Sequence, residues 1–425
     1  MESFDSEASY LAELAHRAGL PDGFRAATTR FHFTPAERPA GKPYGMNLAL
    51  LTVDPPSRSF AGLFTRNRFP GAPVIVARQR MHAPRLAGIL INNKISNVCS
   101  PTGPEDVHTL TSAVAERLGG DASEFLSVST GIIGWSLPVS HMVDSLPNLG
   151  ERLGRADALE VARAIMTTDS FPKVRSATVG GARIVGIAKG AGMVEPNLAT
   201  MLVFLLTDAD IDREALRTIL SRAVAQSFNR ISVDSDQSTS DMVVAVSSQR
   251  HPVDEAAFES ALSGVCSALA GDVVRNGEGT CHVIRVRLRG VEREADAAGL
   301  AKAVVNSPLV KTAVYGNDPN VGRIIGALGD HAGTFDVALD PTLVEVRMGS
   351  EVVFSQGVFR LDKEKELRLS DYLRAAAIDP NSHGFPQHDR CVDIDITCGT
   401  GPAEVEVLGS DLSHGYVTEN ADYRT

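Results

Sequence analysis

Cysteine is scarce in this sequence, and its spacing argues against the sites that depend on it. The chain of 425 residues contains five cysteines, an odd number scattered from Cys99 to Cys398. No two of them form a Cys-x-x-Cys pair, which argues against both a zinc site and a disulfide framework. We therefore expect no metal, and a reducing cytoplasm is the predicted compartment.

The chain also lacks an excess of positive charge and a long apolar run. Its 41 Lys and Arg residues face 52 Asp and Glu residues, a net charge of −11, so we expect no basic face for nucleic acid. The first residues, Met1–Asp5, are acidic and have no apolar core, unlike a signal peptide. No apolar run approaches the roughly 20 residues of a membrane span. Neither nucleic acid nor a membrane is therefore an expected partner.

The composition that remains is typical of a globular protein, with 43% hydrophobic and 22% charged residues. The length alone suggests two or three domains. Apolar spacing predicts helices at 5–18, 105–118 and 156–166, and after the capping residues Asp212 and Asp254. Apolar runs predict strands at 48–53, 74–76, 201–206, 242–246 and 283–288, with a hairpin at 178–185. This mixture predicts α/β layers, with helices outside stacked sheets.

The most informative segment runs from Lys189 to Phe204. Gly190 and Gly192 permit backbone angles that other residues resist, and Pro196 forces an extended or turn geometry just upstream. Thr200 then stands directly before the apolar run. Two interpretations are open, because a β-branched Thr commonly opens a strand, while a hydroxyl at the mouth of a buried strand can also be a nucleophile.

The second interpretation supplies its own base. The Thr200 hydroxyl could add to the carbonyl of Ala199, and the resulting ester could hydrolyse. This self-cleavage would leave Thr200 with a free amine, which is the base that an N-terminal threonine nucleophile needs. Ala199–Thr200 is therefore a candidate cleavage site.

Three further positions could complete an acyl-transfer site, which needs donors aimed at the developing oxyanion. Ser129-Thr130-Gly131 can present backbone N–H groups, although it can also be a simple turn. Lys189 could attract a substrate carboxylate and depress the pKa of a neighbouring amine, or it could be a solvated charge. Glu278 lies between two glycines, a poor place for packing and a plausible one for a positioned carboxylate.

Several strings resemble one known family, in order, over roughly residues 20 to 425. Lys189–Met193 followed by Pro196–Leu202 resembles the self-cleaving segment of the ornithine acetyltransferase family, also called the bifunctional glutamate N-acetyltransferase or ArgJ family. Further matches are Phe64–Asn67, Ser129–Gly134, Ala164–Asp169, Ser227–Arg230, Ser238–Asp241, Gly277–Gly279, Ser307–Ala313, Asp318–Asn320 and Asn420–Thr425. The resemblance implies an αββα-like sandwich with a smaller α/β C-terminal domain.

The resemblance also implies roles for individual residues. Thr200 would be the nucleophile, and the Thr130 hydroxyl and the Gly131 amide would form the oxyanion hole. Glu278 would take part in substrate binding and in proton handling. Substrate contacts are further implied for Thr167, Lys189, Thr200, Asn420 and Thr425.

Three departures from the family pattern suggest that residues outside the catalytic core differ from those of the family. Val321 stands where the family has Trp after Asp-Pro-Asn, and Lys94 occupies a usual glycine, so the path of its loop should differ. A familiar lysine after Glu278 is replaced by His282, which we interpret as structural. This is the pattern expected when the chemistry is kept while the acyl donor or the acceptor amine changes.

The predicted function is that of a self-processed N-acetyltransferase. An acetyl group would pass from N2-acetyl-L-ornithine to Thr200 and then to L-glutamate in a ping-pong cycle, without a cofactor. One alternative is an N-terminal-threonine amidase or aminopeptidase, with water as the acceptor. Others are the same transfer on a related non-standard amino acid, or a catalytically silent scaffold.

Self-cleavage would divide the chain into residues 1–199 and 200–425, with Thr200 as the new amino terminus. In space, we expect a catalytic sandwich over about residues 20–288 and a C-terminal domain over about residues 289–425, with the change near 289–306. The resemblance suggests that two processed chains pair into an α2β2 assembly.

Overall fold

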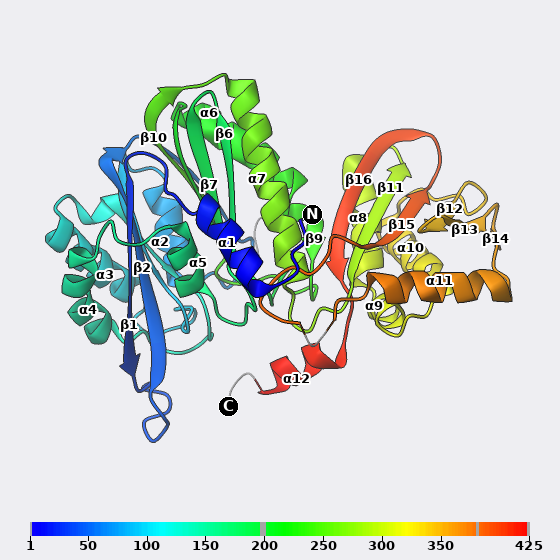
Figure 1. The fold of residues 1–425 in the computed structure, drawn as a ribbon, viewed down its shortest axis with the longest axis horizontal. Coiled ribbons are helices and arrows are strands. Elements are labelled where there is room, and N and C mark those ends of the chain that lie inside the picture. The colour runs from blue at the N-terminus through cyan, green and yellow to red at the C-terminus, as the bar shows by residue number, and fades with distance from the viewer. Residues whose placement is uncertain (1, 196–200, 380–381, 423–425) are drawn as a thin grey trace.

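The computed structural model describes residues 2–195, 201–379 and 382–422, which form three β-sheets flanked by helices (Figure 1). The first sheet contains, in spatial order, β1 (Phe24–Phe33), β2 (Tyr44–Ser57), β4 (Leu86–Asn92) and β5 (Phe125–Ser129). The second contains β3 (Ser59–Phe64), β10 (Met242–Pro252), β8 (Leu202–Asp210), β7 (Ala182–Lys189) and β6 (Lys173–Val179).

These two sheets pack face to face, and successive apolar side chains along a strand point to opposite faces of its sheet. On β8, Phe204 and Leu206 belong to the core between the sheets, whereas Val203 and Leu205 pack toward α6 (Arg213–Gln226) and α7 (Glu255–Arg275). On the far side, α3 (Gly103–Leu118) and α4 (Val139–Glu151) cover the first sheet. Figure 1 shows this helix–sheet–sheet–helix layering from left to right. The predicted αββα-like sandwich is confirmed.

A third sheet is the centre of the smaller C-terminal α/β domain, which the prediction also included. Its spatial order is β14 (Val358–Phe359), β13 (Glu351–Ser355), β12 (Glu345–Met348), β15 (Val392–Thr397), β11 (Val283–Gly290), β16 (Gly401–Ser410) and β9 (Ile231–Ser232). One face packs on α8 (Glu294–Asn306), α9 (Pro308–Tyr315), α10 (Val321–Phe335) and α11 (Lys363–Ala376). β11 precedes the boundary expected at about residue 289, and the division into domains stays a prediction.

The predicted strand at 74–76 is wrong, because these residues lie in helix α2 (Ala72–Arg80). Pro73 stands at the start of this helix, where its missing N–H is not needed. Val74 packs into the core between the sheets, while Val76 packs on Val107 of α3. Val74 and Val76 are therefore buried on two sides of the helix, while Ile75 between them is 41% exposed. Two other helices, α1 (Glu7–Arg17) and α5 (Ala158–Ile165), also contribute to the core between the sheets.

Helix α7 is the one described helix that is long and apolar enough, by length and composition alone, to cross a membrane. The sequence expectation of no span-length apolar segment missed it. Just over half of its apolar window, 56%, is buried inside the fold, with Leu262 and Leu269 in the core beneath the second sheet. A core helix passes the same test, and the packing of α7 is that of a core helix.

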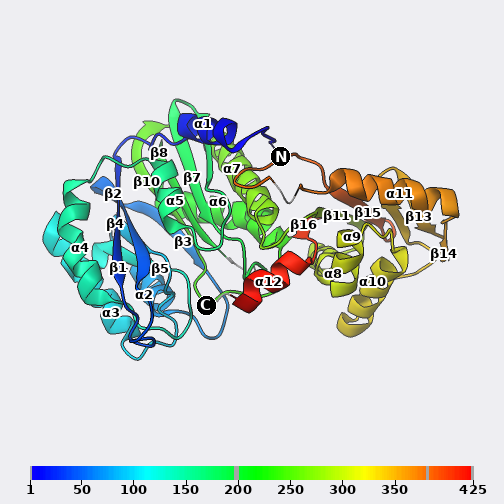
Figure 2. The same cartoon turned by 60° about the horizontal axis from the view of Figure 1, so that its bottom comes forward.

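The second sheet interleaves the parts of the chain on either side of the candidate cleavage site. β3, β6 and β7 come before it, whereas β8 and β10 come after it, yet the spatial order is β3-β10-β8-β7-β6. Hydrogen bonds between β3 and β10 and between β7 and β8 therefore join the two parts. Helix α12 (His414–Asp422) lies between the sandwich and the C-terminal domain (Figure 2).

Candidate active site

A cavity of about 250 Å³ lies where several strands and helices of the sandwich begin or end, next to α12. Its walls come from the turns after β5, α5, β7 and α7, from the start of β8 and from the loop before β10. Segments distant in sequence thus meet in one place. Six predicted site residues line the cavity: Thr130, Gly131, Thr167, Lys189, Glu278 and Asn420.

Thr130 and Gly131 follow β5 in a turn that the neighbouring loop braces. The Ser129 hydroxyl donates to Asn92 Oδ1 at 2.7 Å, and the Thr130 N–H donates to the Asn92 carbonyl at 3.1 Å. Gly131 has a φ of +127°, and a Cβ there would lie 2.2 Å from the carbonyl carbon of Lys94, so only glycine fits. Within the described residues the Gly131 N–H has no acceptor. This donor is therefore available to a ligand.

A buried carboxylate, Asp169, ties two walls of the cavity together. Its oxygens accept hydrogen bonds from Lys173 Nζ at 2.6 Å, from the Gly190 N–H at 2.9 Å and from the Thr167 N–H at 3.1 Å. Burial would raise the pKa of Asp169, but the charges of Lys173 and Lys189 hold it below its usual range. The ionised carboxylate therefore positions Thr167 relative to the Lys189–Gly190 turn.

Glu278 is held between the second sheet and α12. A Cβ on Gly192 would lie 2.1 Å from Glu278 Oε2, so the carboxylate needs a glycine beside it. The same oxygen accepts a hydrogen bond from Asn420 Nδ2 at 2.8 Å. Gly279 has a φ of +64°, and its missing side chain lets the backbone of α12 approach, since a Cβ would lie 2.1 Å from Tyr416 N. Gly192 and Gly279 therefore allow the chain to pack closely around Glu278.

Two further carboxyl groups near Glu278 were not predicted. Burial raises the pKa of Asp234 to about 6. Burial and the charges of Glu278 and Asp169 raise the pKa of Glu419 on α12 to about 7. Such groups exchange protons near neutral pH, which is common at functional sites. No sequence pattern distinguished either residue from an ordinary surface acid, because their burial depends on how distant elements pack.

The loop Ser238–Asp241 forms another wall of the cavity, although its sequence was noted only as a family match. It directly precedes β10, which pairs in parallel with β8 so that Met242 lies opposite Leu202. One signal could have identified this loop. Its polar residues come directly before a strand, and that strand pairs with the strand after Thr200.

Ala199, Thr200 and Thr425 lie outside the described residues. Met201 and Leu202, which follow Thr200 in the chain, line the cavity, and β8 begins at Leu202, one residue after the predicted start. The segment after the candidate nucleophile therefore belongs to the same site as the six residues above.

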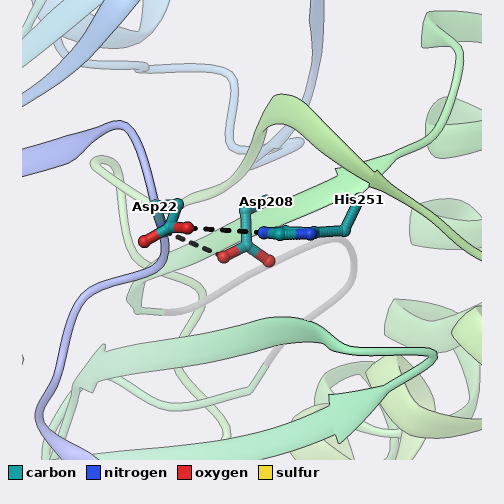
Figure 3. A group of neighbouring side chains, drawn as sticks. All are labelled: Asp22, Asp208 and His251. Atoms are coloured by element: carbon teal, nitrogen blue, oxygen red, sulfur yellow. Dashed lines mark hydrogen bonds and ion pairs between the residues drawn. The ribbon is translucent and has the colours of Figure 1, made fainter.

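Outside the cavity, one described group has the composition of a metal site: Asp22, Asp208 and His251 (Figure 3). Both oxygens of Asp208 already accept backbone hydrogen bonds, from the Asp22 N–H at 2.9 Å and the Arg183 N–H at 2.6 Å. Asp22 Oδ2 in turn lies 3.4 Å from His251 Nε2. These contacts fasten the segment before β1 to the second sheet, which accounts for the group without an ion.

The three departures from the family pattern lie in different parts of the fold, and of the three only Lys94 is described against a residue that lines the cavity. His282 is buried, with Nδ1 2.8 Å from Asp411 Oδ2 and Nε2 3.2 Å from the Leu373 carbonyl. Lys94 has a φ of +76°, the left-handed conformation that glycine favours, directly against the turn at Gly131. Val321 begins α10 in the C-terminal domain.

The fold and the site together define a class of protein: a layered α/β enzyme whose strand ends present hydroxyl, ammonium and carboxylate groups to one small cavity. Within this class, the chain belongs to the ArgJ family, whose model matches residues 38–425.

Two relatives similar in sequence agree with this assignment. The chain is 38% identical over 416 residues to the arginine biosynthesis bifunctional protein ArgJ of Nitratidesulfovibrio vulgaris, covering 95% of this chain and 99% of the relative. It is 37% identical over 367 residues to the glutamate N-acetyltransferase Oat2 of Streptomyces clavuligerus, covering 86% and 90%. Among solved structures, the ornithine acetyltransferase of Mycobacterium tuberculosis complexed with ornithine is 32% identical, with a TM-score of 0.34, covering 43% of this chain and 97% of that chain.

Proposed function

We propose that this chain is a glutamate N-acetyltransferase of the ornithine acetyltransferase type, acting in arginine-type or specialised amino-acid metabolism. It would move an acetyl group from N2-acetyl-L-ornithine to L-glutamate through an ester on Thr200. The observation that carries the proposal is the convergence of six predicted site residues on one cavity, beside the strand that follows Thr200. The activity in the name of the Streptomyces clavuligerus relative supports it.

Maturation would begin with attack of the Thr200 hydroxyl on the Ala199 carbonyl. The amide nitrogen of Thr200 is the leaving group, and water then hydrolyses the ester and leaves Ala199 with a carboxylate. The products would be residues 1–199 and 200–425. The freed amine of Thr200 is then adjacent to its own hydroxyl and can act as the base.

In the transfer step, the Thr200 hydroxyl would attack the acetyl carbonyl while the Thr200 amine takes the hydroxyl proton. The Thr130 hydroxyl and the Gly131 N–H would stabilise the negative charge that develops on the carbonyl oxygen. A donor already fixed by its turn needs little reorganisation, which is why such donors contribute strongly to acyl transfer. Ornithine would leave with the returned proton, and the amine of glutamate would attack the ester.

Recognition would rest on complementary charge. The buried Lys189 ammonium suits a substrate carboxylate, and Glu278 suits an amino group. Thr167, Asn420 and Thr425 would supply the remaining contacts. The hydrogen bond between Asn420 and Glu278 supports a direct part for α12 in substrate binding. Two processed chains would pair as α2β2, and the groups of the chain itself suffice for this chemistry.

Intact mass under denaturing conditions tests the maturation. We expect two fragments, of 199 and 226 residues (425 − 199), with Thr200 at the new amino terminus. A Thr200→Ala variant should stay uncleaved and lose transfer by at least about a thousandfold, since the nucleophile is gone. Transfer retained by that variant would contradict the proposal.

Product analysis with and without acceptor separates transfer from hydrolysis. Acetylglutamate that forms only when glutamate is present supports the transferase, whereas rapid acetate release into water supports an amidase or aminopeptidase. A panel of amino-acid acceptors then tests whether a related non-standard amino acid is preferred to glutamate.

A further inference from the structure

Two side-chain groups in the wall of the cavity are buried without a hydrogen-bond partner in the part of the chain that the structure describes. Ser240 Oγ and Asp241 Oδ2 belong to adjacent residues that line the cavity, and these residues are only 7% and 2% exposed. A buried carboxylate oxygen without a partner is costly and rare in folded proteins. Two such polar atoms on adjacent residues of one cavity wall need a physical reason.

The loop cannot relieve this cost by rearranging, because its backbone is held in place. The Thr65 hydroxyl donates to the Ser238 carbonyl at 2.7 Å, the Gly71 N–H donates to the Thr239 carbonyl at 2.9 Å, and the Thr65 N–H donates to the Asp241 carbonyl at 3.1 Å. The scaffold therefore fixes three carbonyls of the loop, while Ser240 Oγ and Asp241 Oδ2 have no hydrogen-bond partner among the described residues.

The groups around Asp241 leave its negative charge only partly compensated. Burial raises the pKa of Asp241 well above its usual value, and a hydrogen bond from Ser238 and the charge of Lys189 offset only part of this rise. Lys189 on β7 and Glu278 after α7 are the other charged groups that line the cavity, and no hydrogen bond joins Lys189 to Asp241 among the described residues. The ionised form of Asp241 is therefore disfavoured by burial, and a cation bound beside it would stabilise that form.

We propose that Ser240 and Asp241 form a binding corner for an ammonium group in this cavity. An ammonium has three N–H donors and no acceptor, so it can donate to a carboxylate oxygen and to a hydroxyl oxygen. This inference rests on the proposed function, which supplies two such groups, the amine freed at residue 200 and the amine of the amino-acid substrate. The Met242 N–H donates to the Met201 carbonyl at 3.0 Å, so the loop ends beside the chain that follows the cleavage site.

The test compares processed wild-type protein with Asp241→Asn, which keeps the shape and removes the charge, and with Ser240→Ala. The matched control is Ser127→Ala, because Ser127 Oγ is also buried with no partner in the described ranges but does not line the cavity. Acetyl transfer from N2-acetyl-L-ornithine to glutamate is measured across pH 5–9 in each protein. We expect Asp241→Asn to lower kcat/KM roughly ten- to hundredfold, as for a lost hydrogen bond to a charged group, and Ser240→Ala to lower it less.

The two sources of the ammonium give different patterns. If the corner holds the amine at residue 200, Asp241→Asn lowers kcat with little change in KM, and the acidic limb of kcat/KM moves to lower pH by about one unit, because an anion no longer stabilises the protonated amine. If the corner holds the substrate amine, KM for one substrate rises in both variants and the acidic limb stays in place. Either pattern supports an ammonium corner.

Wild-type kinetics in both variants would overturn the inference, as would an equal loss in Ser127→Ala. If Asp241→Asn is not cleaved, the same measurements on Ser240→Ala decide. Failure of the wild-type protein itself to cleave and transfer would instead refute the proposed function, so the two failures are distinguishable.

Discussion

The cavity wall of the sandwich and the open face of the C-terminal sheet use the same charged residue types in opposite environments. Around the cavity, Asp169 and Lys173 are fully buried and pair at 2.6 Å. On the open face, Arg287 of β11 reaches Asp395 at 3.3 Å and Glu406 at 3.0 Å, with a side chain that is 40% exposed. The first pair orients backbone groups that line the cavity, whereas the second covers a sheet surface.

The difference shows where electrostatics determine function in this molecule. A pair excluded from water interacts strongly, and breaking it leaves an uncompensated charge. A pair in water is screened and contributes little. A count of ion pairs would therefore overestimate the electrostatic contribution of the C-terminal sheet. The few charges buried at the cavity fix the geometry of the site.

The largest expected effect is on the buried pair. Lys173→Met should lower the free energy of unfolding by about 3–5 kcal/mol, because Asp169 stays buried without its partner. Urea unfolding in the uncleaved Thr200→Ala background measures this on a single chain. Adding Asp169→Asn should recover part of the loss, and a loss below about 1 kcal/mol would mean that the pair behaves like a surface pair.

A smaller, pH-dependent effect is expected at the rim of the cavity, for Glu419→Gln. Glu419 has a pKa of about 7 in the folded protein, above the value of an unfolded chain, so the folded state binds its proton more tightly. The stability that this gives is complete below about pH 4.5 and is lost as the pH rises through 7. In the same uncleaved background, the variant should equal its parent in Tm at pH 4.5 and exceed it by roughly 1–3 °C at pH 8.

The exposed carboxylate Glu404 on β16 provides the control for this change, as Glu404→Gln. A Tm difference for Glu419→Gln that is the same at both pH values would show that Glu419 is not perturbed by its buried neighbours.

The smallest effect is expected on the open sheet face. Arg287→Ala should change the free energy of unfolding by less than about 1 kcal/mol, and the change should shrink in high salt, because screened pairs contribute little. Acetyl transfer should be unaffected. A loss as large as that of Lys173→Met would remove the contrast between the two regions.

The sequence predicted the architecture because continuous apolar runs indicate strands that are buried on both faces between layers. Val203 and Phe204 on β8 point into different layers, as their positions in an apolar run between two cores require. Resemblance then identified the residues that converge on the cavity. The short run at 74–76 was misassigned because three apolar residues fit a strand and a buried helix equally well.

Other features could not be predicted because they arise from packing between distant segments. The pKa of Glu419 depends on Glu278 and Asp169, which approach α12 only in the folded chain. Ser240 Oγ and Asp241 Oδ2 lack partners among the described residues, on a loop whose backbone is held by Thr65, far away in the sequence. Lys94 has the positive φ that glycine favours. The replacement of a usual glycine by lysine did not by itself indicate this angle.

The interleaved order of the second sheet has a consequence for folding kinetics. A cut between β7 and β8 leaves each fragment held by strands of the other, so the pieces stay together as long as the sheet persists. Before the cut, refolding is a first-order process of a single chain. After the cut, two separate polymers must first meet, so recovery depends on concentration and becomes slow when the protein is dilute. Before maturation, the stability of the protein would be set by a reversible folding equilibrium. After maturation, its lifetime would be set by the rate of unfolding.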